Sequence, residues 1–279
     1  MKNAGKLHVN LIALDLDDTL LNDERKISDR NVEVLKRCAQ RGIYVVLCSG
    51  RAEDGIKPFV SRLNIAALES GKYVIAINGC SIFDMHKRIQ IYKKTVSGEV
   101  LLEAHKIAVE EGFETEVYSD GKVFYSKETD WTLRDVRMCG LNGEEAPDFE
   151  KFLLENQNSF FKMLIPGEPE KIQELQKKLK ASLGEKAVIF TSKPYFLEIL
   201  PPDCGKGEAI EWLSSFIGID HSTTLAFGDS MNDESMIEKC GYGVAMVNGN
   251  EHIKNIADFV TEKTNNDDGV ADFIEKYIL

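Results

Sequence analysis

The sequence predicts an α/β fold in which a parallel β-sheet core carries an inserted α+β domain. Three observations lead to this prediction. Short apolar strands alternate with helices over about the first 80 residues, hairpin patterns replace this alternation in the middle of the chain, and the alternation returns after Pro201 and Pro202. Short buried strands separated by helices are typical of a parallel sheet that is covered on both faces.

The first part of the chain supplies three strands and two helices of the core. Continuous apolar runs predict buried strands at residues 7–14, 43–48 and 73–77. Ser28 is a favourable N-cap and Gly42 a favourable helix stop, which predicts a helix over 28–40. A second helix is expected over 51–63.

The middle of the chain predicts an antiparallel α+β module. Asp120 and Gly121 form a hairpin motif between two β patterns, and His86 lies at a second turn. Both His86 and His105 are expected at the surface. The expected strands are two within 81–94 and others at 113–118, 122–126, 160–165 and 187–191, with helices at 98–111 and 168–183.

The last part of the chain repeats the pattern of the first. Strands are expected at 223–227, 243–246 and 259–261, and helices at 206–217, 231–239, 251–257 and the chain end. The simplest organisation is one core domain made of residues 1–84 and 199–279, with an inserted domain of residues 85–198.

Composition limits the classes of function. The net charge of −12 over 279 residues argues against nucleic acid or an anionic membrane as the main partner, although it allows a small anionic substrate. The six cysteines form no CxxC pair and are expected to be buried reduced thiols. The first residues lack an apolar signal core and no apolar run could cross a bilayer, so a cytoplasmic protein is expected, as a monomer or small homo-oligomer.

Four polar motifs follow strands or open the next helix. They are residues 15–19 (DLDDT), 48–51 (CSGR), 205–207 (GKG) and 228–233 (GDSMND). Ligands of open parallel sheets bind at the carboxyl ends of the strands, so these motifs are expected to converge.

The residue types in these motifs indicate phosphoryl transfer. Ser49 and Lys206 supply a hydroxyl and an ammonium group that suit phosphate oxygens. A group of carboxylates without nearby His or Cys favours Mg²⁺, and the candidate carboxylates are Asp15, Asp17, Asp229 and Asp233. Asp15 and Asp17 are two residues apart, so one could attack phosphorus while the other transfers protons.

These motifs resemble those of the haloacid dehalogenase superfamily of phosphatases, and specifically its Cof-type subfamily with a type IIB cap. DxDx[TV] matches residues 15–19, Ser49 stands in a Ser-Gly-Arg context, Lys206 matches the third motif, and GDxxND matches residues 228–233. The resemblance covers the whole chain, and the large insertion lies where that cap belongs. One difference is Asp18, where many relatives carry Gly, and we expect Asp18 to have a structural role in the loop.

The resemblance implies roles for the acidic residues and Lys206. Asp15 would be the nucleophile and a Mg²⁺ ligand. Asp17 would be the general acid/base and would offer its backbone carbonyl to the metal. Asp229 would be a further ligand, and Asp233 would support the metal through water or hold Lys206.

The resemblance also implies a phosphate-binding group. Ser49 and Lys206 would grip the phosphate, with help from backbone N–H groups near Asn232. Arg51 would contact substrate or form a structural ion pair. Asn78 and Gly79 form the turn after the third strand, which would face the cleft or be a plain turn.

The sequence therefore predicts Mg²⁺-dependent hydrolysis of small phosphomonoesters, such as sugar phosphates, through an aspartyl-phosphate. The cap would close over the cleft and select the leaving group. Two alternatives stay open: a phosphotransferase or phosphomutase that passes the phosphoryl group to a sugar hydroxyl, and a non-catalytic sensor of a phosphorylated ligand.

Overall fold

The computed structural model describes residues 5–279, and the chain folds as two compact units. The core unit consists of Met1–Tyr92 and Gly205–Leu279, and the inserted unit of Lys93–Cys204. The sequence pattern places the divisions after residues 84 and 198. They fall later in the structure because the β4–β5 hairpin extends the core sheet, whereas β11 (Phe196–Leu200) belongs to the sheet of the inserted unit.

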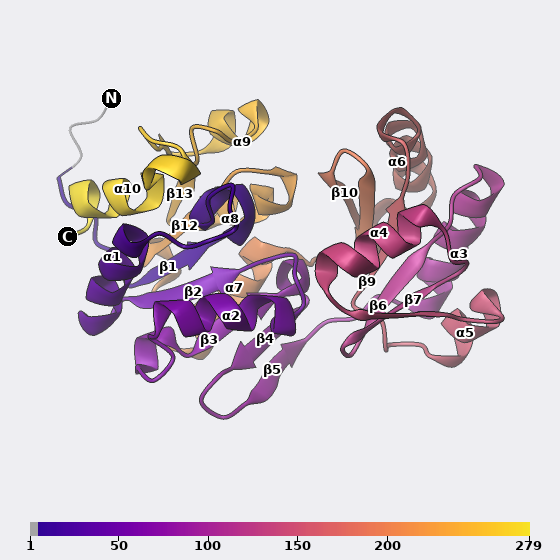
Figure 1. Ribbon diagram of the computed structural model, residues 1–279, viewed down its shortest axis with the longest axis horizontal. Helices are drawn as coiled ribbons and strands as arrows, with labels where there is room; N and C mark the ends of the chain where they lie inside the picture. Colours follow the sequence, from indigo (N-terminus) through magenta and orange to yellow (C-terminus); the bar gives the residue numbers. More distant parts are fainter. Residues whose placement is uncertain (1–4) are drawn as a thin grey trace. The chain divides into compact units, whose positions relative to one another are not determined.

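The core unit is built on an eight-stranded sheet with the order β14-β13-β12-β1-β2-β3-β4-β5 (Figure 1). The strands from β14 to β3 are parallel, and β4 pairs antiparallel with β3. This confirms the predicted parallel core. The bounds are β1 Leu11–Leu14, β2 Tyr44–Cys48, β3 Tyr73–Ala76, β4 Ser81–Asp84, β5 Ile89–Lys93, β12 Thr224–Gly228, β13 Tyr242–Ala245 and β14 Phe259–Val260.

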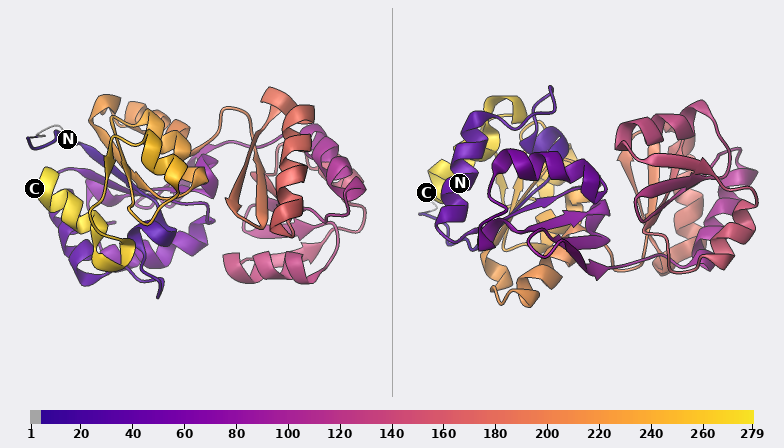
Figure 2. Two further views of the ribbon diagram at one scale, coloured as in Figure 1. Left: turned by 90° about the horizontal axis from the view of Figure 1, so that it is seen from above. Right: turned by 60° about the horizontal axis from the view of Figure 1, so that its bottom comes forward.

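The core helices begin and end close to the predicted positions. Ser28 caps α1 by accepting a hydrogen bond from the Asn31 N–H, and Gly42 follows the helix at φ +83°. Helix α1 contacts α2 and α10, as Figure 2 shows, and α7 contacts α8. The bounds are α1 Asp29–Gln40, α2 Glu53–Leu63, α7 Lys206–Phe216, α8 Glu234–Lys239, α9 Glu251–Ile256 and α10 Gly269–Tyr277.

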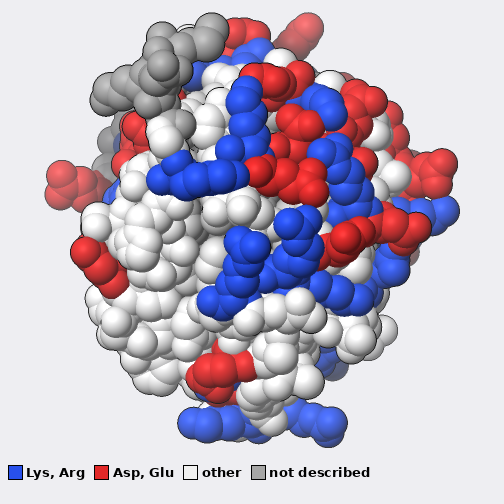
Figure 3. Space-filling model, turned by 90° about the vertical axis from the view of Figure 1, so that its left-hand side faces the viewer, with Lys and Arg blue, Asp and Glu red and all other residues white. Residues whose placement is uncertain are grey.

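The surface formed by α1 and α10 carries charges of both signs. Figure 3 shows Lys and Arg side chains lying among Asp and Glu on this side of the core unit. Arg30 pairs with Glu275 at 2.7 Å, and Lys263 pairs with Asp272 at 2.6 Å. At least these two cations of the surface are therefore paired with neighbouring carboxylates.

The inserted unit is a six-stranded sheet with the order β10-β11-β9-β6-β7-β8, antiparallel except for β7 and β8. This confirms the predicted α+β character. The sequence analysis placed no element between 127 and 159, where the structure has α4, β8 and α5. The bounds are α3 Gly98–Glu110, β6 Glu116–Ser119, β7 Lys122–Tyr125, α4 Asp130–Cys139, β8 Asn142–Glu145, α5 Phe149–Glu155, β9 Lys162–Pro166, α6 Pro169–Leu183, β10 Val188–Lys193 and β11 Phe196–Leu200.

Several smaller predictions can be compared directly. The cysteines at 38, 48, 80, 204 and 240 are buried and form no disulfide, as predicted. Burial raises the pKa of Cys38 to about 11, so its thiol stays protonated. The surface position predicted for His105 is wrong, because its ring is buried beside Thr115 at 2.8 Å. No helix within residues 5–279 combines the length and apolar character needed to cross a membrane.

The sheet of the inserted unit has one apolar face and one face on which buried charged residues lie beside a smaller apolar cluster. Val117, Met163 and Leu197 point into the main hydrophobic cluster, because side chains alternate along each strand. Their neighbours Glu116, Lys162 and Glu198 are buried on the opposite face, where Lys162 pairs with Glu198 at 2.9 Å and Asp135 of α4 is also buried.

Glu116 lies in this charged group without a proton donor to its carboxyl oxygens. Burial first, and then the neighbouring Asp135 carboxylate, raise the pKa of Glu116 well above its usual range. Burial therefore favours the protonated form of Glu116 relative to an exposed glutamic acid.

Replacing this acid by a neutral isostere should change the pH dependence of stability. The pKa of Glu116 is higher in the folded than in the unfolded state, so its favourable contribution is complete in acid and is lost as the pH rises above the usual Glu value. Between pH 5 and pH 8, we expect the unfolding free energy of Glu116→Gln to rise relative to wild type by at least about 1 kcal/mol, measured by urea denaturation.

The exposed Glu155 of the same unit provides the matched control. Glu155→Gln should keep the wild-type pH profile. A difference between Glu116→Gln and wild type that stays constant from pH 5 to pH 8 would show that Glu116 is ionised in the folded state.

Candidate functional site

Three of the predicted residues follow adjacent strands at one edge of the core sheet. Leu14 of β1 is paired with Leu47 of β2 and with Phe227 of β12. Asp15, Ser49 and Asp229 come one or two residues after these positions, and the Asp15 N–H donates to the Phe227 carbonyl at 3.1 Å. The parallel register therefore brings together residues that are more than 200 positions apart in the sequence.

Lys206 is the centre of this site. Its side chain is fully buried, and its Nζ lies 2.5 Å from Asp15 Oδ1 and 2.5 Å from Asp233 Oδ1. Lys206 is the first residue of α7. The second residue, Gly207, allows α7 to approach α8, because a Cβ there would lie 2.2 Å from the Ser235 carbonyl oxygen.

Asp233 is engaged by protein donors on both carboxylate oxygens. Oδ1 accepts from Lys206, and Oδ2 accepts from the N–H groups of Asp229 at 2.9 Å and Ser230 at 3.1 Å. Of the two roles considered for Asp233, this geometry favours the one in which it holds Lys206 and orders the loop after β12.

Asp15, Asp229 and Asp233 form a buried carboxylate group. One oxygen from each lies within 4.8 Å of the others, an arrangement that could hold a metal ion. Burial, opposed by the Lys206 ammonium and assisted by Asp233, raises the pKa of Asp15 to about 7. Burial and then the Asp233 and Asp15 carboxylates raise the pKa of Asp229 well above its usual range.

With all three acids ionised, this buried group of three carboxylates and the Lys206 ammonium carries an excess of negative charge. Burial alone would lower the pKa of Lys206, but Asp15 and Asp233 raise it above its usual value, so the ammonium stays charged. A hard cation bound to the carboxylate oxygens would supply the missing positive charge, and an oxygen-only donor set fits such a cation.

Thr19 joins this group through a hydrogen bond that the sequence analysis did not assign. Its Oγ1 donates to Asp229 Oδ1 at 2.7 Å, and both groups are buried. The bond links the DLDDT motif to the GDSMND motif across 210 positions. The Thr in DxDx[TV] was the available clue, but its partner could not be identified without the fold.

Asp17 lies apart from the three-carboxylate group and pairs with Arg51. The Arg51 Nε and NH2 groups donate to Asp17 Oδ2 at 2.9 Å and Oδ1 at 2.6 Å. The Arg51 guanidinium also lies over the Phe59 ring, 5.3 Å from its centroid. Of the two roles considered for Arg51, the structure contains the ion pair, which is 27% exposed on the Arg51 side rather than buried.

Ser49, Asn78 and Asn232 lie on connected backbone and side-chain hydrogen bonds. Ser49 Oγ accepts from the Arg51 N–H at 3.2 Å, and the Ser49 carbonyl accepts from the Asn78 N–H at 3.0 Å. Asn232 Nδ2 donates to Asn78 Oδ1 at 3.1 Å. The structure therefore brings these three predicted residues together.

Gly79 lies in a tightly packed turn where a side chain would not fit. Residues 77, 78 and 79 all have positive φ, which is costly for Ile77 but not for glycine. A Cβ on Gly79 would lie 2.0 Å from the Gly205 carbonyl oxygen, directly before Lys206. The turn thus packs closely against the segment that leads to Lys206.

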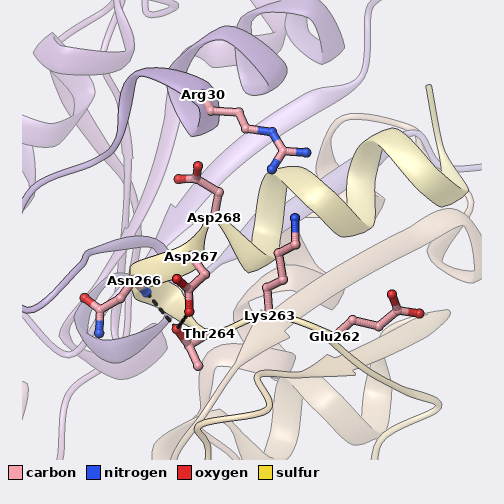
Figure 4. Close-up of a pocket in the computed structure, with 7 residues that line it drawn as sticks. All are labelled: Arg30, Glu262, Lys263, Thr264, Asn266, Asp267 and Asp268. Atoms are coloured by element: carbon pink, nitrogen blue, oxygen red, sulfur yellow. Dashed lines mark hydrogen bonds between the residues drawn. The ribbon is translucent and has the colours of Figure 1, made fainter.

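A pocket of about 580 Å³ in the core unit contains none of the predicted site residues (Figure 4). Its cations Arg30 and Lys263 are already paired with Glu275 and Asp272. The pocket is lined by Arg30, Glu262, Lys263, Thr264, Asn266, Asp267 and Asp268.

Comparison with known proteins gives a consistent match over the whole chain. The haloacid dehalogenase-like hydrolase family matches residues 12–274. A 5-amino-6-(5-phospho-D-ribitylamino)uracil phosphatase of Bacillus subtilis is 30% identical, over 96% of this chain and 97% of its own.

Solved structures show the same fold. A haloacid dehalogenase-like hydrolase from Bacteroides thetaiotaomicron is 33% identical, with a TM-score of 0.81 over 96% of this chain and 99% of its own. A sugar phosphatase of subclass IIB has a TM-score of 0.81 over 96% of this chain and 99% of its own, at 20% identity.

Removing the buried ammonium should destabilise the protein strongly. In Lys206→Met, Asp15 and Asp233 would lose their cation and remain buried. We expect a loss of about 3–5 kcal/mol of unfolding free energy at pH 7 without added metal, measured by urea denaturation.

The exposed Lys57, which pairs with Glu53 and Asp54, provides the control. Lys57→Met should change stability by less than about 1 kcal/mol. Equal losses in the two variants would contradict a central role for the Lys206 ion pairs.

Proposed function

Because the chain belongs to the haloacid dehalogenase superfamily, as a Cof-type phosphatase of subclass IIB that acts on small phosphorylated metabolites, we propose that it uses Mg²⁺ and an aspartyl-phosphate intermediate. The observation that carries this proposal is the buried group of Asp15, Asp229 and Asp233 around the Lys206 ammonium.

Mg²⁺ fits this site because its donors are carboxylate oxygens and because three carboxylates there share one ammonium group. Asp15, Asp229 and the backbone carbonyl of Asp17 would hold the ion, with Asp233 acting through Lys206 or a water molecule. When bound, the metal would offset the repulsion between the carboxylates and the phosphate dianion.

The chain's own residues then divide the reaction between them. An Asp15 carboxylate oxygen attacks phosphorus while the bond to the leaving oxygen breaks, and Asp17 donates a proton to that oxygen. Asp17 next accepts a proton from the water molecule that attacks the phosphorus and returns Asp15 to its free form. Lys206 would balance charge on the phosphoryl oxygens, and the Ser49 hydroxyl would donate a hydrogen bond to them.

Arg51 connects substrate binding to Asp17. Its guanidinium is bound to the Asp17 carboxylate by two hydrogen bonds. A phosphate dianion competes well for a guanidinium. We therefore expect substrate to draw Arg51 toward its phosphate, which releases Asp17 to exchange protons, while Asn78 and Asn232 contact the substrate from the adjacent loops.

The substrate is expected to be a sugar phosphate or a similar phosphomonoester. The solved relative of subclass IIB is described as a sugar phosphatase, and the B. subtilis relative acts on a phosphorylated ribitylamino compound. The inserted unit would act as the cap that selects the leaving group. Phosphate release without any acceptor sugar would distinguish hydrolysis from the phosphotransferase or phosphomutase alternative, and no hydrolysis with Mg²⁺ present would support the sensor alternative.

Asp15→Asn should abolish turnover and leave the fold intact, because an amide oxygen is a poor nucleophile. The measurement is Mg²⁺-dependent phosphate release from 4-nitrophenyl phosphate, with circular dichroism to check folding. Asp18→Asn is the matched control, since Asn tolerates the left-handed φ of +62° at this position. Near-normal turnover in Asp15→Asn would refute the nucleophile assignment.

Asp229→Asn should weaken metal binding. Replacing one charged ligand in a small carboxylate group is expected to raise the Mg²⁺ concentration for half-maximal activity at least about tenfold. Added Mg²⁺ should also raise the Tm of the wild type and have a smaller effect on this variant.

The acidic loop near the C-terminus provides the control for this metal test. Asp268 also has a left-handed φ, of +61°, and lies outside the carboxylate group. Asp268→Asn should keep the wild-type response to Mg²⁺. A wild-type Tm that does not respond to Mg²⁺ would contradict the metal assignment.

A further inference from the structure

The loop that carries Asp15 and Asp17 has an unusual conformation. Residues Leu16–Leu20 form a single wide turn, closed by a hydrogen bond of 2.8 Å from the Leu21 N–H to the Leu16 carbonyl. Asp18 has a φ of +62°, in the left-handed region that disfavours most residues with a Cβ. Contacts from outside the turn can therefore help to hold Asp18 in this conformation.

Two asparagines from the C-terminal part of the chain supply that support. Asn248 Nδ2 donates to the Asp18 carbonyl at 2.8 Å, and Asn265 Nδ2 donates to the Leu21 carbonyl at 2.9 Å. The two are connected, because Asn248 Oδ1 accepts from the Asn265 N–H at 3.1 Å. Asn265 is only 6% exposed, so its amide has little access to competing water.

The contacts bracket the residues that follow Asp17. Asn248 binds the carbonyl of Asp18, the residue with the positive φ, and Asn265 binds the carbonyl of Leu21, directly after the turn. Thr19, between them, is bound to Asp229. The direction of the Asp17 side chain depends on the φ and ψ angles of this turn, and a displacement of about 1 Å can cost a large factor in rate.

We propose that Asn248 and Asn265 are positioning residues for Asp17: they hold the turn after Asp17 in the conformation that presents its carboxyl group to the leaving oxygen. This inference rests on the proposed function, in which Asp17 is the general acid. It assigns a role in the reaction to two residues that touch neither the carboxylate group nor Lys206.

Asn266 provides a matched control on the same loop. Its Oδ1 accepts from the Asp23 N–H at 2.9 Å, two residues beyond Leu21. Figure 4 shows its side chain directed away from Arg30 and Lys263. Asn266 thus also binds the backbone of the segment after Asp17, as an acceptor rather than a donor, but beyond the turn that carries Asp17.

The test compares two aryl phosphates of similar shape. The leaving group of phenyl phosphate is about as basic as a tyrosine side chain and needs a proton, whereas that of 4-nitrophenyl phosphate is much less basic. In Asn248→Ala, which removes an exposed side chain, we expect kcat/KM to fall about tenfold for phenyl phosphate and less than about threefold for 4-nitrophenyl phosphate, with Tm unchanged.

Three further variants separate positioning from stability. Asn266→Ala should keep wild-type kcat/KM for both substrates. Asp18→Gly should reduce the effect of Asn248→Ala, because glycine adopts a positive φ without the cost that Asp18 pays. Asn265→Asp, which removes the Nδ2 donor while keeping the side-chain shape, should show the same selective loss for phenyl phosphate.

The opposite results are equally clear. An equal loss for both substrates in Asn248→Ala, or no loss in either, would overturn the positioning role. Failure of the proposed function would be visible separately, as absence of Mg²⁺-dependent hydrolysis of either phosphate by the wild-type protein.

Discussion

The buried contact between the Lys206 ammonium and the Asp15 and Asp233 carboxylates is the interaction on which the site depends. Isolated charges are too costly to bury, and these three groups are stable in the interior because each has a partner. Asp15 ends β1, Lys206 begins α7, and Asp233 follows β12. The same ion pairs therefore fix the relative positions of the three segments. They also leave an excess of carboxylate charge that a metal ion would balance.

Much of this architecture could be predicted from the sequence. The apolar runs identified the core strands, Ser28 and Gly42 marked the ends of α1, and the order of the four motifs predicted that they meet at one sheet edge. Strand β8 was missed, like α4 and α5, and its own sequence explains why: Asn-Gly-Glu-Glu has no apolar alternation, and its pairing with β7 is a tertiary contact. Boundaries of the units were also hard to place, since the β4–β5 hairpin resembles the hairpins of the inserted unit.

The contacts between site residues were less predictable than their identities. Sequence motifs name Asp17 and Arg51 but do not show that they bind each other, and nothing near Asn248 or Asn265 marks them as neighbours of the DLDDT loop. The first fact follows from the parallel pairing of β1 with β2, and the second from the sheet order that places β12, β13 and β14 on the other side of β1. The charged face of the inserted sheet has a similar origin, because Glu116, Lys162 and Glu198 come from three separate strands.

The central claim is that Asp15 carries the phosphoryl group between substrate and water. The most direct measurement is mass spectrometry of the protein after rapid acid quenching of a reaction with 4-nitrophenyl phosphate and Mg²⁺. We expect a phosphorylated peptide with the modification on Asp15 during turnover. A phosphoryl group on another residue, or turnover at full rate with no phosphorylated protein at any time, would contradict it.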